Sequence, residues 1–303
     1  MATTIAATPT LTRASATELA GLIRRGDVSA REVVDAHIAR IEAVNPQLNA
    51  VVFPMFEEAR AAAEAADAAR SRGDPMGVLH GVPMTLKDQH LVAGTPTTLG
   101  LPSRRGHRAA ADGPCVARLR AAGAIFLGKT NVGQVLFSYE SDNPLFGRSS
   151  NPWSLDRSPG GSSGGEAAIV AAGGSALGFG ADLGGSVRVP AHFCGVHSLK
   201  PTAARLTNLD TPEGIFCEQE TIPAQPGPIA RHVGDLELAM SVVAAPGMDR
   251  LDPSVPAVPW RESHGVEGLH VGWYEDDGAF RPSPAVRRAV RDAAAAQIGR
   301  AHV

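Results

Sequence analysis

The chain has 303 residues, 44% of them hydrophobic and 19% charged, and its formal net charge at pH 7 is −3. This balance is typical of a globular protein and excludes a basic surface for nucleic acid or an anionic membrane. No stretch approaches the roughly 18 consecutive apolar residues of a membrane span, and the N-terminal segment MATTIAATPTLTRAS lacks the features of a signal peptide. Three cysteines are too few for a disulfide framework, so we expect a cytoplasmic protein. The ten histidines form no metal-binding motif, and we expect neither a metal nor a cofactor.

Predicted helices and strands alternate along the chain. A Ser-x-x-Glu capping box at Ser29 and Glu32 begins one helix, and Asn45-Pro46 is expected to end it. We predict helices over residues 17–25, 29–44, 56–70, 116–122, 167–172 and 233–245. Strands are predicted over residues 51–53, 124–127, 187–189 and 269–274, together with a turn and strand over 79–88 that presents Lys87 at its end. Residues 141–159 are predicted to form a loop. This alternation predicts an α/β fold with helices layered over one sheet, and no linker divides it into domains.

The last part of the chain is unusual. A helix is predicted to begin after Ser283, a good N-cap residue, with Pro284 in its first position. The chain then ends in IGRAHV, without a further element to cover that helix. Our hypothesis is that the sequence comes from a truncated gene model, that residues 298–303 are not native, and that residues 1–303 form one incomplete domain. A genuine stop codon after Val303 at the resequenced locus would contradict this hypothesis.

The most informative segment runs from Ser158 to Pro201 and contains eleven of the 33 glycines. Two glycine clusters bracket an apolar run: the first glycine cluster is GGSSGG at 160–165, and the second is GGS at 184–186. Glycine at this density is useful where the backbone must approach another group closely, as at oxyanion or phosphate sites. The apolar residues between the clusters argue against a flexible linker.

Lysine is scarce, because 25 of the 28 basic residues are arginines and the only lysines are Lys87, Lys129 and Lys200. A lysine can lose its proton near neutral pH when it is buried, whereas an arginine cannot. A retained lysine therefore indicates either a position that needs a neutral amine or a position that packs the slimmer side chain.

Two familiar motifs match the chain in residue spacing but not in the secondary structure that each motif needs. Residues 123–130 match the P-loop pattern G-x-x-x-x-G-K-T, but the four central positions are an apolar strand and not the loose loop that surrounds a phosphate. The first glycine cluster matches the G-x-S-x-G nucleophile elbow of α/β-hydrolases, but the polar residues 154–159 before it do not read as the required strand. We therefore favour neither nucleotide binding nor an elbow nucleophile.

A third arrangement joins both glycine clusters to a lysine. Lys87 could act as base, Ser162 as proton relay and Ser186 as nucleophile. The backbone N–H groups that could form an oxyanion hole belong to Leu183, Gly184, Gly185 and Ser186. Lys87 would have to be neutral near pH 7, which is about three units below its free pKa and costs about 4 kcal/mol that burial can impose. The residues alone do not select this trio over the other serines.

Considered jointly, these motifs resemble the amidase signature family. The matching segments are GVPMTLKD, GKTN, NPLFG with the later NPW, PGGSSGGEAA, GxGADLGGSVRVPAHFCG and LKPT, in the family's order. The resemblance covers nearly the whole chain, from the Ser29 helix to about Phe280. It implies one α/β domain with a mixed central sheet between helix layers, and a Ser-cisSer-Lys catalytic set. In that set Lys87 is the base, Ser162 the relay serine after a cis peptide bond, and Ser186 the nucleophile.

The resemblance also implies a reaction and a set of supporting residues. Ser186 attacks an amide carbonyl, Ser162 returns a proton to the leaving amine, and water hydrolyses the acyl-enzyme to a carboxylic acid. Ser163, Asp182 and Arg188 are expected to support the catalytic residues. For Asp182 and Arg188, a buried ion pair without a catalytic role is the alternative.

A few positions indicate which branch of the family the chain resembles. Gln134 stands where amidotransferase-type members often carry glutamate, and residues 137–140 and Glu166 look more like the branch that includes fatty-acid amide hydrolases. Ser138 is assigned to substrate binding. We therefore expect a stand-alone hydrolase of a small-molecule amide that binds no nucleic acid, with a homodimer as one possible assembly. The alternatives are a glutaminase-type subunit of a glutamine-dependent amidotransferase and an inactive fragment.

Overall fold

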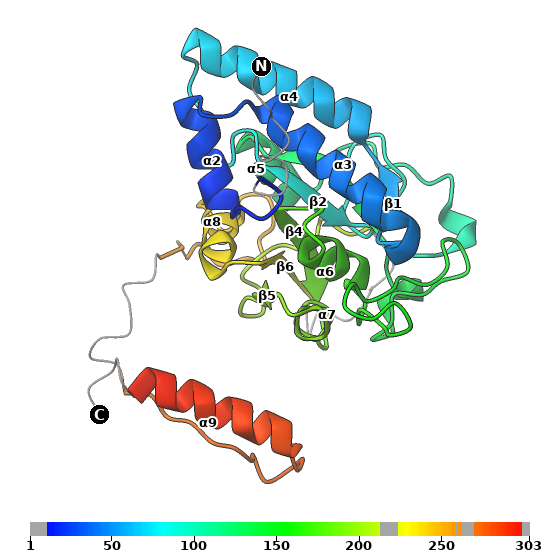
Figure 1. Ribbon diagram of the computed structural model, residues 1–303, viewed down its shortest axis with the longest axis vertical. Helices are drawn as coiled ribbons and strands as arrows, with labels where there is room; N and C mark the ends of the chain where they lie inside the picture. The colour runs from blue at the N-terminus through cyan, green and yellow to red at the C-terminus, as the bar shows by residue number, and fades with distance from the viewer. Residues whose placement is uncertain (1–10, 213–223, 259, 262–269, 299–303) are drawn as a thin grey trace, which may run out of the picture. The chain divides into compact units, whose positions relative to one another are not determined.

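The computed structural model describes residues 11–212, 224–258, 260–261 and 270–298 (Figure 1). The chain divides into two compact units, Met1–Trp260 and Arg261–Val303. In the second unit, α9 (Pro284–Ile298) follows Ser283, as predicted, and the Ser283 hydroxyl accepts the Val286 N–H at 3.4 Å. The predicted strand over 269–274 is wrong for residues 270–274, which form no strand, and Leu269 lies outside the described residues.

The first unit is built on a six-stranded sheet with the strand order β1-β3-β2-β4-β6-β5. The strands are β1 (Val51–Pro54), β2 (Pro83–Lys87), β3 (Ile125–Thr130), β4 (Leu177–Asp182), β5 (His197–Ser198) and β6 (Gln225–Ala230). β2 runs parallel to β3 and β4, whereas β1 and β6 run antiparallel to their inner neighbours. The sheet is therefore mixed, and the predicted fold class is confirmed.

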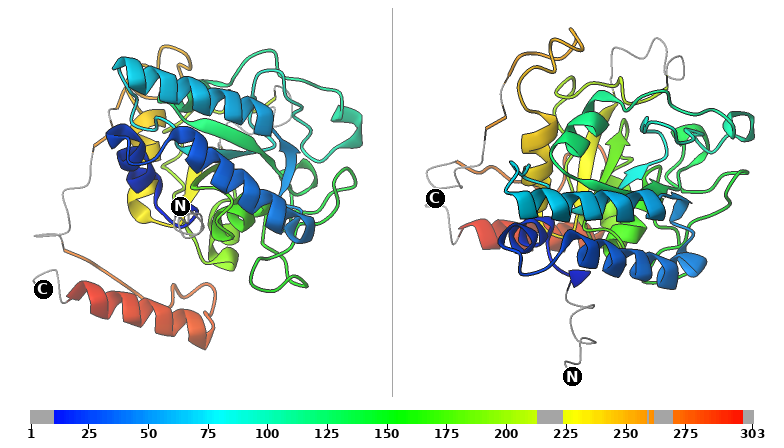
Figure 2. Two further views of the ribbon diagram at one scale, coloured as in Figure 1. Left: turned by 45° about the horizontal axis from the view of Figure 1, so that its top comes forward. Right: turned by 90° about the horizontal axis from the view of Figure 1, so that it is seen from above.

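Helices pack on this sheet and on one another. These helices are α2 (Ala16–Arg25), α3 (Ala30–Leu48), α4 (Phe56–Arg72), α5 (Pro114–Ala121), α6 (Gly164–Ala171), α7 (Arg188–Cys194) and α8 (Val233–Val243). α3 lies beside α4 and also contacts α6, which packs against β2, β4 and β6 (Figures 1 and 2). α5 and α8 contact each other. Two short 3-10 helices, η1 (Pro102–Arg104) and η2 (Gln134–Leu136), lie in connections. Within the described ranges, no helix is both long and apolar enough to cross a membrane.

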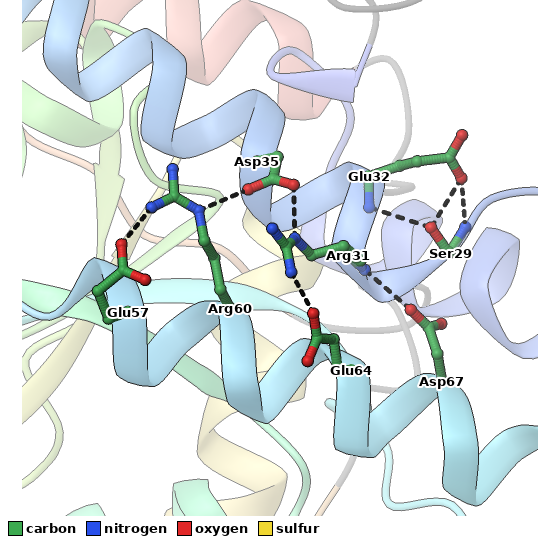
Figure 3. Close-up of polar contacts among 8 residues, drawn as sticks. All are labelled: Ser29, Arg31, Glu32, Asp35, Glu57, Arg60, Glu64 and Asp67. Atoms are coloured by element: carbon green, nitrogen blue, oxygen red, sulfur yellow. Dashed lines mark hydrogen bonds and ion pairs between the residues drawn. The ribbon is translucent and has the colours of Figure 1, made fainter.

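Side-chain caps fix the start of α3 (Figure 3). The predicted capping box is present, because the Ser29 hydroxyl accepts the Glu32 N–H at 3.0 Å and the Glu32 carboxylate accepts the Ser29 N–H at 2.8 Å. Asp67 of α4 adds a second cap by accepting the N–H groups of Ala30 and Arg31 at 2.8 and 3.0 Å. These bonds satisfy donors that a helix start leaves open. Ion pairs along the outer surface join Arg31 to Asp35 and Glu64, and Arg60 to Asp35 and Glu57.

The end of α3 differs from the prediction. The helix continues past Pro46 to Leu48, so the predicted stop at Asn45-Pro46 is wrong. Pro46 lies inside the last turn, where it cannot donate to the carbonyl four residues earlier and its ring crowds that carbonyl, yet the helix continues for two more residues. Asn49, in the left-handed conformation with a φ of 47°, ends the helix instead. The Asn45 side chain accepts N–H groups from the following turn, which directs the chain into β1.

The segment after the second glycine cluster is also different. Residues 187–189 were predicted as a strand from their branched side chains, but Arg188 begins α7. The Asp182 carboxylate accepts the N–H groups of Val187 and Arg188 at 3.0 and 3.2 Å. A carboxylate that satisfies the first donors of a helix favours the helical conformation, and here this tertiary contact outweighs local strand propensity.

Candidate active site

The candidate site lies where the first glycine cluster meets the central strands. Lys87 is the last residue of β2, as predicted, and α6 begins directly after Ser163. Glycines on β4 let α6 approach the sheet closely: a Cβ at Gly178 would lie 2.5 Å from Glu166 Oε1, and one at Gly180 would lie 2.8 Å from Ser163 Oγ. A side chain at either position would collide with the Glu166 or Ser163 side chain, so one of these groups would have to move.

Lys87 and Ser162 are in direct contact. Lys87 Nζ donates to Ser162 Oγ at 2.8 Å and to the Ala181 carbonyl at 3.3 Å. Lys87 is 1% exposed and Ser162 is fully buried. The peptide bond between Gly161 and Ser162 is cis. The structure therefore places a buried amine where it can exchange a proton with a buried hydroxyl.

Burial makes it easier for Lys87 to lose its proton. Removing the ammonium group from water lowers the pKa of Lys87 to about 7, although the nearby carboxyl groups of Asp182, Glu166 and Asp88 act in the opposite direction. A substantial fraction of this lysine is consequently neutral near pH 7.

Glu166 is a buried acid that the sequence marked only as a feature of the family branch. It is fully buried on α6, and its two carboxyl oxygens accept hydrogen bonds from the hydroxyls of Thr85 on β2 and Thr130 on β3, the latter at 2.7 Å. Burial raises the pKa of Glu166 to about 8, because the two hydroxyls only partly offset the loss of water. Burial therefore favours the protonated form of Glu166 at neutral pH, whereas its ionised form would favour the protonated form of Lys87.

Asp182, at the end of β4, organises the second glycine cluster. Its carboxylate is fully buried and accepts the Gly185 N–H at 2.8 Å, the Val187 and Arg188 N–H groups, and the Arg188 guanidinium at 2.8 and 3.0 Å. Burial alone would raise the pKa of Asp182, but these hydrogen bonds lower it to about 2. Asp182 thus stays ionised and holds the loop that carries Ser186.

Ser186 is half-buried and lies beside the first glycine cluster. Its carbonyl accepts the Ser163 N–H at 3.1 Å, so the backbones of the two clusters are directly joined. Of the four N–H groups predicted to form an oxyanion hole, the one of Gly185 already donates to Asp182. The groups left for a substrate oxygen are the N–H groups of Leu183, Gly184 and Ser186.

The remaining candidate residues occupy different places. Ser163 is fully buried, and its hydroxyl donates to the Ala181 carbonyl at 3.4 Å. Ser138 is exposed, and its hydroxyl accepts the Glu140 N–H at 3.0 Å. It is next to Tyr139, which reaches the second glycine cluster by donating to the Gly184 carbonyl at 2.6 Å. From the sequence, this tyrosine is noted only within residues 137–140, which resemble one branch of the family, and it is not assigned to the site.

Lys129, the second buried lysine, contacts a loop and none of the candidate catalytic residues. Lys129 lies within β3, and Nζ donates to the Pro96 carbonyl at 2.5 Å and to Thr97 Oγ1 at 3.0 Å. The P-loop match at 123–130 therefore falls on a strand, as the apolar residues predicted. Cys115 and Cys194 are buried free thiols with pKa values raised by burial, and Cys217 lies outside the described residues.

Comparison with known proteins gives a consistent result. Residues 32–301 match the sequence model of the Amidase family. The chain is 38% identical over 275 residues to fatty-acid amide hydrolase 1 of Sus scrofa, covering 90% of this chain and 46% of that protein. It is 40% identical over 250 residues to a subunit of the glutamyl-tRNA(Gln) amidotransferase of Anaeromyxobacter dehalogenans, covering 81% and 49%.

Solved structures give the same picture. A bacterial aryl acylamidase of the amidase signature family superimposes with a TM-score of 0.85 and 33% identity, covering 96% of this chain and 60% of that one. The chain spans about half the length of the curated relatives that it matches. Over the matched region, both sequence and fold agree with these relatives, and the chain belongs to the amidase signature family.

Proposed function

We propose that this chain carries the catalytic residues of an enzyme that hydrolyses a carboxylic amide to an acid and an amine or ammonia. The observation that carries the proposal is the buried hydrogen bond of 2.8 Å between Lys87 Nζ and Ser162 Oγ. A lysine with a pKa of about 7 can serve as a general base at neutral pH. Ser186, on the loop held by Asp182, is the nucleophile in this proposal.

The proposed reaction proceeds through an acyl-enzyme. Neutral Lys87 takes the Ser162 hydroxyl proton while Ser162 takes the proton of Ser186 Oγ, which forms a bond to the amide carbon. The resulting oxyanion is stabilised by the N–H groups of Leu183, Gly184 and Ser186, because the Gly185 N–H donates to Asp182. As the C–N bond breaks, Ser162 donates its proton to the leaving nitrogen and takes back the proton held by Lys87, which is then neutral again. A water molecule attacks the ester carbon and loses a proton through Ser162 to Lys87. The same relay returns a proton to Ser186 Oγ as the bond to the acyl carbon breaks and the acid leaves.

A glutaminase-type subunit of a glutamine-dependent amidotransferase is the second candidate. The 40% identity to one component of such a complex favours it. The two candidates differ in what they need, because a stand-alone amidase turns over simple amides without partner chains. Hydrolysis of such amides by the purified chain alone would support the first candidate, and hydrolysis only in the presence of partner chains would support the second.

A fluorophosphonate probe tests the identity of the nucleophile. Because the probe phosphonylates an activated serine, we expect one label per chain, on the peptide that contains Ser186. Digestion and mass spectrometry of the labelled chain locate the modified residue. A label on Ser162 or Ser163 would show that the first glycine cluster supplies the nucleophile, and the proposed roles would then be wrong.

A further inference from the structure

Tyr139 makes a contact that the proposed reaction does not use. Its hydroxyl donates to the Gly184 carbonyl at 2.6 Å. A Cβ at Gly185 would lie 3.2 Å from Tyr139 Cε1, and one at Gly184 would lie 3.7 Å from the hydroxyl oxygen, so the ring lies against both glycines. The Tyr139 side chain is nevertheless 56% exposed. Tyr139 therefore contacts the second glycine cluster, which carries Ser186, from the solvent side.

The peptide unit between Gly184 and Gly185 is held at both ends. Its carbonyl accepts the Tyr139 hydroxyl, and its N–H donates to Asp182 Oδ1 at 2.8 Å. Gly185 has a φ of 134°, which residues with a side chain rarely adopt. A peptide unit flanked by two glycines can rotate easily, so these two hydrogen bonds fix its orientation. That orientation also sets the direction of the neighbouring N–H groups of Gly184 and Ser186.

The residues that follow Tyr139 hold the other glycine cluster. The backbone of Glu140 packs so closely on Gly161 that a Cβ there would collide with the Glu140 carbonyl group. Ser141 Oγ accepts the Gly164 N–H at 2.8 Å and donates to the Gly160 carbonyl at 3.1 Å. Three consecutive residues, 139–141, therefore contact both glycine clusters, and we name them the connecting segment.

We infer that the connecting segment sets the spacing between the two glycine clusters, and that Tyr139 is a positioning residue for amide hydrolysis. Ser162 follows Gly161 and Ser186 follows Gly185, so the segment contacts the residue directly before each serine. Tyr139 touches no reacting atom, and it acts through the peptide unit between Gly184 and Gly185. The catalytic part of this inference rests on the proposed function, whereas its structural part does not.

Replacing Tyr139 by phenylalanine removes only the hydroxyl. We expect Tyr139→Phe to lower kcat about tenfold with KM changed less than twofold, because the oxyanion donors are misplaced while the substrate still binds. A boronic acid that forms a tetrahedral adduct with Ser186 should lose affinity by the same factor, since it needs the same donors. The matched control is Tyr274→Phe, which changes the only other tyrosine and should leave kcat and the boronate affinity unchanged.

Amide hydrogen exchange tests the structural part without any activity. The Gly185 N–H should exchange at least fivefold faster in Tyr139→Phe than in the parent chain, and at the parent rate in Tyr274→Phe. Unchanged exchange at Gly185 would overturn the inference, and so would a kcat within twofold of a parent chain that hydrolyses amides. If the parent neither hydrolyses amides nor labels at Ser186 while Gly185 exchange accelerates as expected, the connecting segment is supported and the proposed function fails.

Discussion

Replacing Ser186 by alanine is expected to lower kcat for amide hydrolysis on the order of 10⁵- to 10⁶-fold, the scale measured when a hydrolase loses its nucleophilic serine. Without Oγ no acyl-enzyme forms, and only direct attack of water on the bound amide remains, assisted by the backbone N–H donors. The loss should appear in kcat and not in KM, because Ser186 contributes little to substrate binding. Steady-state hydrolysis and loss of fluorophosphonate labelling are the measurements.

Ser163→Ala is the matched control for this substitution. Ser163 is, with Ser162, one of the two serines of the first glycine cluster that match the G-x-S-x-G pattern, yet its hydroxyl is fully buried and donates only a long hydrogen bond of 3.4 Å to the Ala181 carbonyl. We expect its replacement to reduce kcat far less than that of Ser186. If instead Ser163→Ala abolished labelling and Ser186→Ala retained it, the assignment of the nucleophile would be wrong.

Replacing Lys87 by methionine is expected to lower kcat on the order of 10⁴-fold, which is typical for the removal of one member of a catalytic triad. Methionine keeps most of the buried aliphatic stem and removes the amine that contacts Ser162 at 2.8 Å. Lys87→Arg should be as inactive, because a guanidinium does not lose its proton near neutral pH. The two variants together separate the loss of a base from the loss of a positive charge.

Lys129→Met is the matched control, because it also replaces a buried lysine by methionine. Lys129 is also fully buried, but its amine holds the loop at Pro96 and Thr97 and does not contact a candidate catalytic residue. Its replacement should lower the midpoint of thermal unfolding, with little effect on kcat per folded molecule. A Lys87→Met variant with nearly the parent kcat would contradict the role of Lys87 as base.

The sequence predicted those parts of the fold that depend on local signals. The capping box at Ser29, the strand that ends at Lys87 and the strand within 124–127 all formed, because their side chains carry the pattern that each element needs. β4 and β6 were not predicted. β4 contains Gly178 and Gly180, and β6 has the sequence QPGPIA, so neither has ordinary strand composition. In β4, tertiary contacts require the glycines, since Glu166 and Ser163 occupy the space beside them.

Only part of the candidate site could be predicted, again because some of its residues lie in local motifs and others are brought together only by the fold. The family motifs contain Lys87, Ser162 and Ser186, so these residues could be named from the sequence. The contact of Tyr139 with Gly184 joins residues 45 positions apart, and it leaves no local pattern. The burial of Glu166 by threonines on two strands is likewise a property of the packed sheet and not of a sequence motif.

The pH dependence of kcat/KM tests most directly whether neutral Lys87 is the base. The reactive form lacks a proton on Lys87, whose pKa burial lowers to about 7, so the neutral fraction falls as the pH decreases. We therefore expect kcat/KM to rise about tenfold per pH unit below pH 7 and to level off above it. The residual activity of Lys87→Met should lack this inflection. A parent profile that is flat between about pH 5.5 and 8.5, or an inflection near pH 7 that persists in Lys87→Met, would contradict the account.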